Sequence, residues 1–158
     1  MYARRFDDSH AEFEVALRLN PNFSLAQAYY SLLLHFCGRS AEADLAARRA
    51  LRLSPHGPVS AIYLGIASCA QYIRCNYKEA MRFAREAVRH RADYVTAHRA
   101  LTAAAGMAGE DDAAKAALLE LRRVQPDVSL EWIAKQIPIE DDSEREQYLE
   151  GFRRAGLD

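Results

Sequence analysis

Cysteine is scarce in this sequence: Cys37, Cys69 and Cys75 are the three among 158 residues, and no two of them have CxxC spacing. An odd number of cysteines without that spacing argues against a disulfide framework or a zinc site and fits a reducing cytoplasm. The five histidines do not cluster at metal-ligand spacing either. We therefore expect no metal, no cofactor and a cytoplasmic location.

An excess of charge of one sign is also lacking. Lys and Arg number 21 against 22 Asp and Glu, which gives a formal net charge of −1, so no global field favours nucleic acid. Residues 55–73, within the longest uncharged stretch, contain Pro, Gly, His and Ser and are too polar to span a membrane. The first residues contain no apolar run of the kind found in signal peptides. We expect neither nucleic acid nor a membrane as a partner.

Sequence motifs of the common enzyme classes are missing as well. The chain has no GxxxxGK[ST], GxGxxG, HExxH or GxSxG, so neither a phosphate-binding loop nor a zinc-protease or serine-hydrolase motif is present. No set of residues favours catalysis, and we expect a protein that is not an enzyme.

The sequence does contain an internal repeat. Ala-Leu-Arg-Leu-Asn-Pro at residues 16–21 returns as Ala-Leu-Arg-Leu-Ser-Pro at residues 50–55, 34 residues later. Weaker copies follow at residues 87–92 and 121–126. A fixed period of this length that ends in proline predicts stacked helix–turn–helix units.

The turns inside these units are marked by residues that accept a tight backbone. Gly38 and Gly109 divide two of the units and are expected to end a helix in the left-handed conformation. The middle unit lacks this glycine, and we expect Asn76 to take its place. Its three extra residues are placed most simply at positions 56–58. Small residues at the facing positions should let the paired helices approach closely; these are Ser31, Ala43, Ala50, Thr102 and Ala114.

Together these features resemble the tetratricopeptide repeat (TPR). The resemblance rests on the small residue early in each second helix, on aromatics near the turns and on the closing prolines, and it covers roughly residues 4–126; its residues are Ala43, Ala80, Ala114, Phe6, Tyr77, Phe13, Pro21, Pro55 and Pro126. It implies an all-α, right-handed superhelix of about 3.5 repeats with a C-terminal helical cap. The expected units are a half repeat at 4–21, repeats at 22–55, 56–92 and 93–126, and capping helices within 127–158. Ser129 and Asp141 should open the two capping helices, Pro138 should end the first and Gly156 the second.

In TPR folds the first helices of successive units line a concave groove. The resemblance places nine candidate partner-binding residues there: Leu25, Tyr29, Leu32, Phe36, Ile62, Ile66, Tyr72, Ile73 and Arg99. The set is unusually apolar for a surface, which is typical of an interaction site. The alternative is that a short array curls tightly, so that these residues pack on each other or on the C-terminal helices. The sequence leaves both interpretations open.

The beginning of the array is expected to be incomplete. Residues 4–9 match the turn and the start of a second helix, so the first helix of that unit would precede Met1. Either the chain was cut from a longer array or another chain covers the exposed stripe. In the second case Phe6, Phe13 and Leu17 are candidates for self-association into a homodimer.

The resulting hypothesis is a non-catalytic protein–protein interaction module that binds a partner segment in the groove. One alternative is a regulatory or oligomerisation region of a bacterial signalling protein such as a nucleotide cyclase. It rests on a similarity of residues 20–23, 52–58 and 148–157 to the C-terminal TPR region of bacterial adenylate/guanylate cyclase-like proteins. The other alternative is a homodimer through the unpaired N-terminal helix.

Overall fold

The structure, a computed structural model, describes residues 2–54, 59–137, 139 and 141–158, and these form nine helices and no strand. The expectation of an all-α fold is confirmed. The helices, in chain order, are α1 (Tyr2–Leu19), α2 (Ser24–Phe36), α3 (Ser40–Leu53), α4 (Ser60–Ile73), α5 (Tyr77–His90), α6 (Val95–Ala108), α7 (Asp111–Val124), α8 (Leu130–Gln136) and α9 (Asp142–Ala155).

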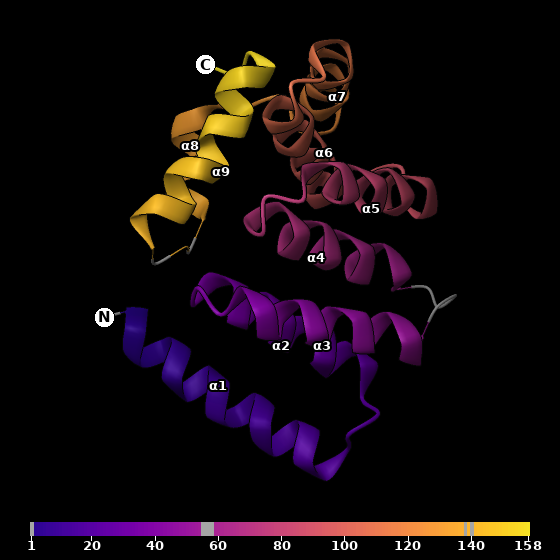
Figure 1. Cartoon of the computed structure of the whole chain (residues 1–158), viewed down its shortest axis with the longest axis vertical. Coiled ribbons are helices and arrows are strands. Elements are labelled where there is room, and N and C mark those ends of the chain that lie inside the picture. Colours follow the sequence, from indigo (N-terminus) through magenta and orange to yellow (C-terminus); the bar gives the residue numbers. More distant parts are fainter. Residues whose placement is uncertain (1, 55–58, 138, 140) are drawn as a thin grey trace.

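Three helix pairs stack along the long axis of the molecule, with α1 at one end and α8 and α9 beside the stack (Figure 1). The pairs are α2 with α3, α4 with α5, and α6 with α7. The first helices α2, α4 and α6 contact one another in sequence, whereas the second helices contact only first helices within the stack. The first helices therefore form the inner layer of a helical solenoid.

All three pairs close with the same turn. Gly38 and Gly109 have φ of 71° and 70°, which confirms the left-handed conformation expected for them. In the middle pair the expectation for Asn76 is wrong: Cys75 has φ of 59° and Asn76 has φ of −86°. In each turn the amide of the next residue bonds a carbonyl five residues back, as in Asn76 N to Gln71 O at 2.9 Å. This Schellman geometry requires a positive φ at that register, whichever residue stands there. The expected insertion at 56–58 lies outside the described residues.

Small side chains bring the two helices of a pair together, as expected. The Ser31 hydroxyl donates to the Ala43 carbonyl at 2.6 Å, and the Ser68 hydroxyl donates to the Ala80 carbonyl at 2.8 Å. A bond from a side chain to the opposite backbone is possible only where the helices lie very close. All of the predicted small residues are fully buried: Ser31, Ala43, Ala50, Thr102 and Ala114.

The N-terminal segment differs from the expectation. Residues 4–9 do not contain a turn, because α1 is one continuous helix from Tyr2 to Leu19. The segment has neither glycine nor proline to interrupt it. Among the described helices α1 packs on α2 alone, through contacts such as Phe13 against the Tyr30 ring at 5.9 Å between centroids.

The C-terminal helices begin and end where the sequence indicates. The Ser129 hydroxyl accepts from the Trp132 amide at 3.1 Å, and Asp141 accepts from the Glu144 amide at 2.9 Å. Gly156 ends α9 with φ of 92°; Pro138 lies outside the described residues. Helix α9 packs on α6 and α7, as expected for a cap, and it also reaches α4.

Candidate protein-binding groove

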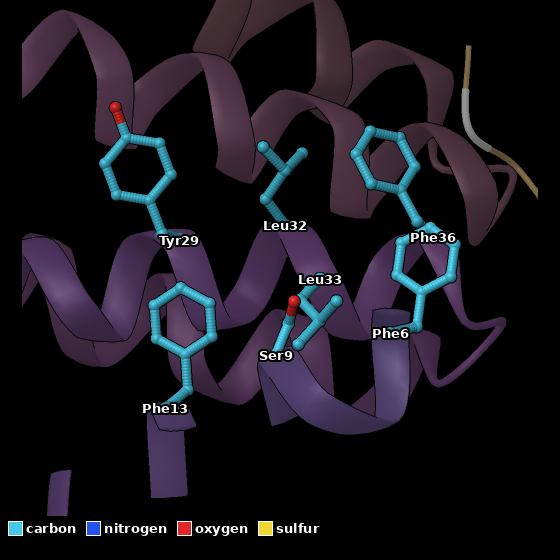
Figure 2. A pocket seen from close by; sticks show the side chains of 7 residues that line it. All are labelled: Phe6, Ser9, Phe13, Tyr29, Leu32, Leu33 and Phe36. Atoms are coloured by element: carbon cyan, nitrogen blue, oxygen red, sulfur yellow. The ribbon is translucent and has the colours of Figure 1, made fainter. Parts of the chain in front are cut away.

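An apolar groove separates α1 from α2. Its volume is about 340 Å³. Phe6, Ser9 and Phe13 project from α1 on the side that faces α2 (Figure 2). The opposite wall is formed by α2, from Tyr29, Leu32, Leu33 and Phe36. The groove contains aromatic and aliphatic surface with hardly any polar groups, which is suited to apolar side chains of a partner.

A second cavity of about 220 Å³ lies on the other side of the same α2 residues. Its walls come from five helices and from Ile137 and Ile139, which follow α8. The lining residues are Leu32, His35, Phe36, Cys69, Thr96, Arg99, Trp132, Ile133, Gln136, Ile137, Ile139 and Tyr148. Leu32 and Phe36 line both cavities. The two cavities are therefore neighbours that share a wall formed by Leu32 and Phe36.

Arg99 is the cation of the second cavity. Its Nε and Nη2 atoms donate to Gln125 Oε1 at 2.9 and 2.7 Å. Its guanidinium stacks over Trp132, 4.5 Å from the ring centroid, which is worth about 0.5–2 kcal/mol. Burial lowers the Arg99 pKa, and the charges of Tyr148 and Asp127 oppose that shift. Within the described part of the chain, no carboxylate forms an ion pair with Arg99.

His35 and Cys69 are neutral residues of the same cavity. The His35 side chain is almost completely enclosed, at 4% exposure, and burial lowers its pKa to about 4. Its Nδ1 atom has no hydrogen-bond partner among the described residues, and an orphaned buried group of this kind costs about 1–3 kcal/mol. Burial raises the pKa of the Cys69 thiol to about 11, so it stays protonated and is a poor nucleophile.

The nine predicted groove residues fall into three groups. Tyr29, Leu32, Phe36 and Arg99 line the two cavities. Leu25 and Ile62 are half-buried and pack against the core between the first two pairs. The remaining three, Ile66, Tyr72 and Ile73, are in the interior.

Two kinds of packing enclose these interior residues. Ile66 is enclosed because α4 lies between α2 and α6. Tyr72 is only 2% exposed because α9 covers it, and its hydroxyl donates to the Gln147 carbonyl at 2.7 Å. Packing on neighbouring helices, the alternative that the sequence left open, therefore describes the middle of the groove. The predicted groove residues that stay open to solvent line the groove between α1 and α2 or the cavity bordered by α8 and α9.

The candidate self-association residues border two different depressions along α1. Phe6 and Phe13 line the groove against α2. Leu17 borders a different surface depression, next to Tyr30 and Arg49. All three side chains are half-buried by α2. The structure therefore brings Phe6 and Phe13 together and separates Leu17 from them.

Sequence reasoning did not assign Trp132, Ile133, Gln136 and Tyr148 to the groove. They belong to the C-terminal helices, which were expected to cap the array. The apolar face of α9 was visible in the sequence, but its period does not say which earlier helices it will cover. The sequence signal that could have pointed to these residues is Arg99. A cation on an inner helix needs an aromatic or polar neighbour, which another helix has to supply.

No group of three or more His, Cys, Asp or Glu side chains is arranged to hold a metal ion in the described ranges. None of the helices in that part of the chain combines the length and apolar character needed to cross a membrane.

Comparisons with known proteins identify the fold. Neither a scan against protein-family models nor a search of curated proteins found a match. Two crystal structures of MamA, a TPR-like protein, superpose on this chain with a TM-score of 0.68 and 18% sequence identity. One alignment covers 95% of this chain and 86% of the MamA chain, and the other covers 98% and 82%. The chain therefore has the predicted TPR-type fold, an all-α solenoid. The comparisons do not support the link to nucleotide cyclases.

Proposed function

We propose that this chain is a non-catalytic interaction module that holds a segment of a partner protein on its concave face. The observation that carries this proposal is the pair of neighbouring apolar cavities that share Leu32 and Phe36. Open apolar surfaces of this kind usually mark interaction sites, and TPR-type solenoids present such concave surfaces for binding. None of the three cysteines, all in the described part of the chain, forms a disulfide, which fits a cytoplasmic setting.

The groove favours a segment with regularly spaced apolar side chains. Tyr29, Leu32 and Phe36 follow one face of α2 at helical spacing, and Phe6 and Phe13 supply the opposite wall. An amphipathic helix would place its own apolar stripe between these walls, in the manner of helix-in-groove recognition. An extended segment would use alternate side chains in the same space.

A site-specific photo-crosslinker tests the proposal. We expect p-benzoylphenylalanine at Phe36 to capture a defined partner in the native cells, and the same group at Leu119 to capture none. Leu119 is the matched control, because it is 70% exposed on α7 and lines neither cavity.

A charge in the groove should then abolish capture. Tyr29 is 41% exposed, so Tyr29→Asp should leave helical circular dichroism unchanged while capture by a crosslinker at Phe36 disappears. Leu119→Asp should not change capture. Equal capture in the Tyr29→Asp and Leu119→Asp variants would contradict the proposal that the partner binds in this groove.

Self-association through α1 is a second candidate function. It is favoured by the packing of α1 on a single helix and by its exposed apolar residues, of which Leu19 is 80% exposed. We expect a dimer by light scattering that Phe13→Glu converts to a monomer, with Asp8→Glu as a control on an exposed position of α1. A monomer at high protein concentration would count against this candidate.

A further inference from the structure

The cavity between α2, α6, α8 and α9 has the features of a ligand site in its own right. Its volume of about 220 Å³ is below the range of about 300–1,000 Å³ that is common for drug-sized ligands. Its walls are largely aromatic and aliphatic, with residues such as Phe36, Trp132 and Ile133. The space is therefore suited to a single ring or a short branched chain.

Arg99 lines this cavity, and its guanidinium keeps unused hydrogen-bond donors. Gln125 Oε1 accepts one hydrogen each from Nε and Nη2, and Trp132 covers one face, whereas Nη1 has no hydrogen-bond partner among the described residues. Asp127 favours the charged form of Arg99 electrostatically but is not within ion-pair distance. The edge formed by Nη1 and Nη2 is the geometry that binds a carboxylate with two parallel hydrogen bonds.

A half-buried cation without a paired anion is costly, and so is the orphaned Nδ1 of His35 in the same wall. Gln125 and Trp132 hold Arg99 in place, so a bound anion would not have to order its side chain. A ligand with one negative charge would offset the burial of Arg99, and an apolar body would fill the remaining space. Neither a polyanion nor a neutral polar molecule has this combination.

We propose that this cavity binds a small apolar carboxylic acid, with the carboxylate on Arg99 and the apolar body against Trp132, Phe36 and Leu32. This site goes beyond the proposed partner binding, since a partner could lie along α1 and α2 while the cavity is empty. Its first test uses small probes without a peptide backbone, so a failure of these probes to bind would leave the interaction proposal intact.

Trp132 provides the readout, because it is the single tryptophan of the chain and lines the cavity. The probe is 3-phenylpropionate, and its matched controls are the neutral 3-phenylpropanol and the cationic 3-phenylpropylamine. We expect a saturable change in Trp132 fluorescence with the acid, at a concentration at least tenfold lower than with either control. The acid should also raise the melting temperature of the unmodified protein. Equal responses to acid and alcohol, or no response to any probe, would overturn the proposal.

A variant and a second probe complete the test. Arg99→Gln should weaken binding of the acid at least tenfold, while Arg122→Gln, on an exposed arginine outside the cavity, should leave it unchanged. If Arg99→Gln does not fold, the melting-temperature comparison of the three probes on the unmodified protein decides. Binding of the peptide Ac-Gly-Gly-Phe at least tenfold tighter than the free acid would assign the site to the C-terminus of a partner chain and overturn the small-acid proposal.

Discussion

Replacing Gly106 by alanine should destabilise the protein, because α6 and α9 cross with backbone against backbone at this residue. A Cβ atom on Gly106 would collide with the carbonyl oxygen of Gly151. The reverse contact is equally close: a Cβ on Gly151 would lie 2.5 Å from the Ala103 carbonyl oxygen and 2.5 Å from Tyr72 Oη. Because backbone atoms cannot turn aside, α9 as a whole would have to move.

The expected loss follows from two opposing effects. Overpacking of a close contact costs about 1–3 kcal/mol, and a collision with backbone puts Gly106→Ala near the upper limit. Alanine in place of glycine inside a helix contributes about 1 kcal/mol in the opposite direction. We therefore expect the free energy of unfolding to fall by about 2 kcal/mol.

Urea denaturation followed by far-ultraviolet circular dichroism measures this loss. The matched control is Gly65→Ala on α4, which has the same gain in helix propensity. Its Cβ would lie 3.0 Å from the ring of Tyr94, a half-exposed side chain that can shift. The control should stay within about 1 kcal/mol of the unmodified protein. If Gly106→Ala unfolds at the same or a higher urea concentration than the unmodified protein, the close crossing of α6 and α9 is refuted.

Three further predictions concern single residues. Cys75→Gly should raise the free energy of unfolding by about 0.5 kcal/mol, because Cys75 has φ of 59° and the left-handed conformation disfavours side chains; an unchanged or lower urea midpoint would contradict this. Burial holds the His35 pKa at about 4 against an ordinary 6.5, so the unfolded chain binds a proton first as the pH falls. Between pH 6.5 and 4 the free energy of unfolding of the unmodified protein should drop by up to about 3 kcal/mol more than that of His35→Gln. If the free energies of unfolding of the two proteins fall in parallel with pH, this effect of His35 is contradicted. Asp44→Ala should cost about 1–3 kcal/mol, because it leaves the buried Gln71 amide, now bonded at 2.6 Å, without its acceptor; a thermal or urea midpoint equal to that of the unmodified protein would refute this role.

The local features of the fold follow from the sequence, because each depends on neighbours within one turn or one helix pair. Gly38 and Gly109 end helices since only a residue that tolerates positive φ fits that register. Ser129 and Asp141 open the capping helices by accepting a backbone amide three residues later. Cys75 is the exception. Residue preference predicted the left-handed conformation at Asn76, whereas the hydrogen-bond register of the turn places it at Cys75.

The groove depends on contacts that periodicity does not encode. The sequence by itself determined the helices from α2 onward, the pairing of α2 to α7 and the apolar stripe on α2 that includes Tyr29, Leu32 and Phe36. The tertiary structure alone decided that α9 covers Tyr72 and that Trp132 meets Arg99. A hydrophobic period shows which face of a helix avoids water, but which distant helix covers that face depends on how the whole stack curves.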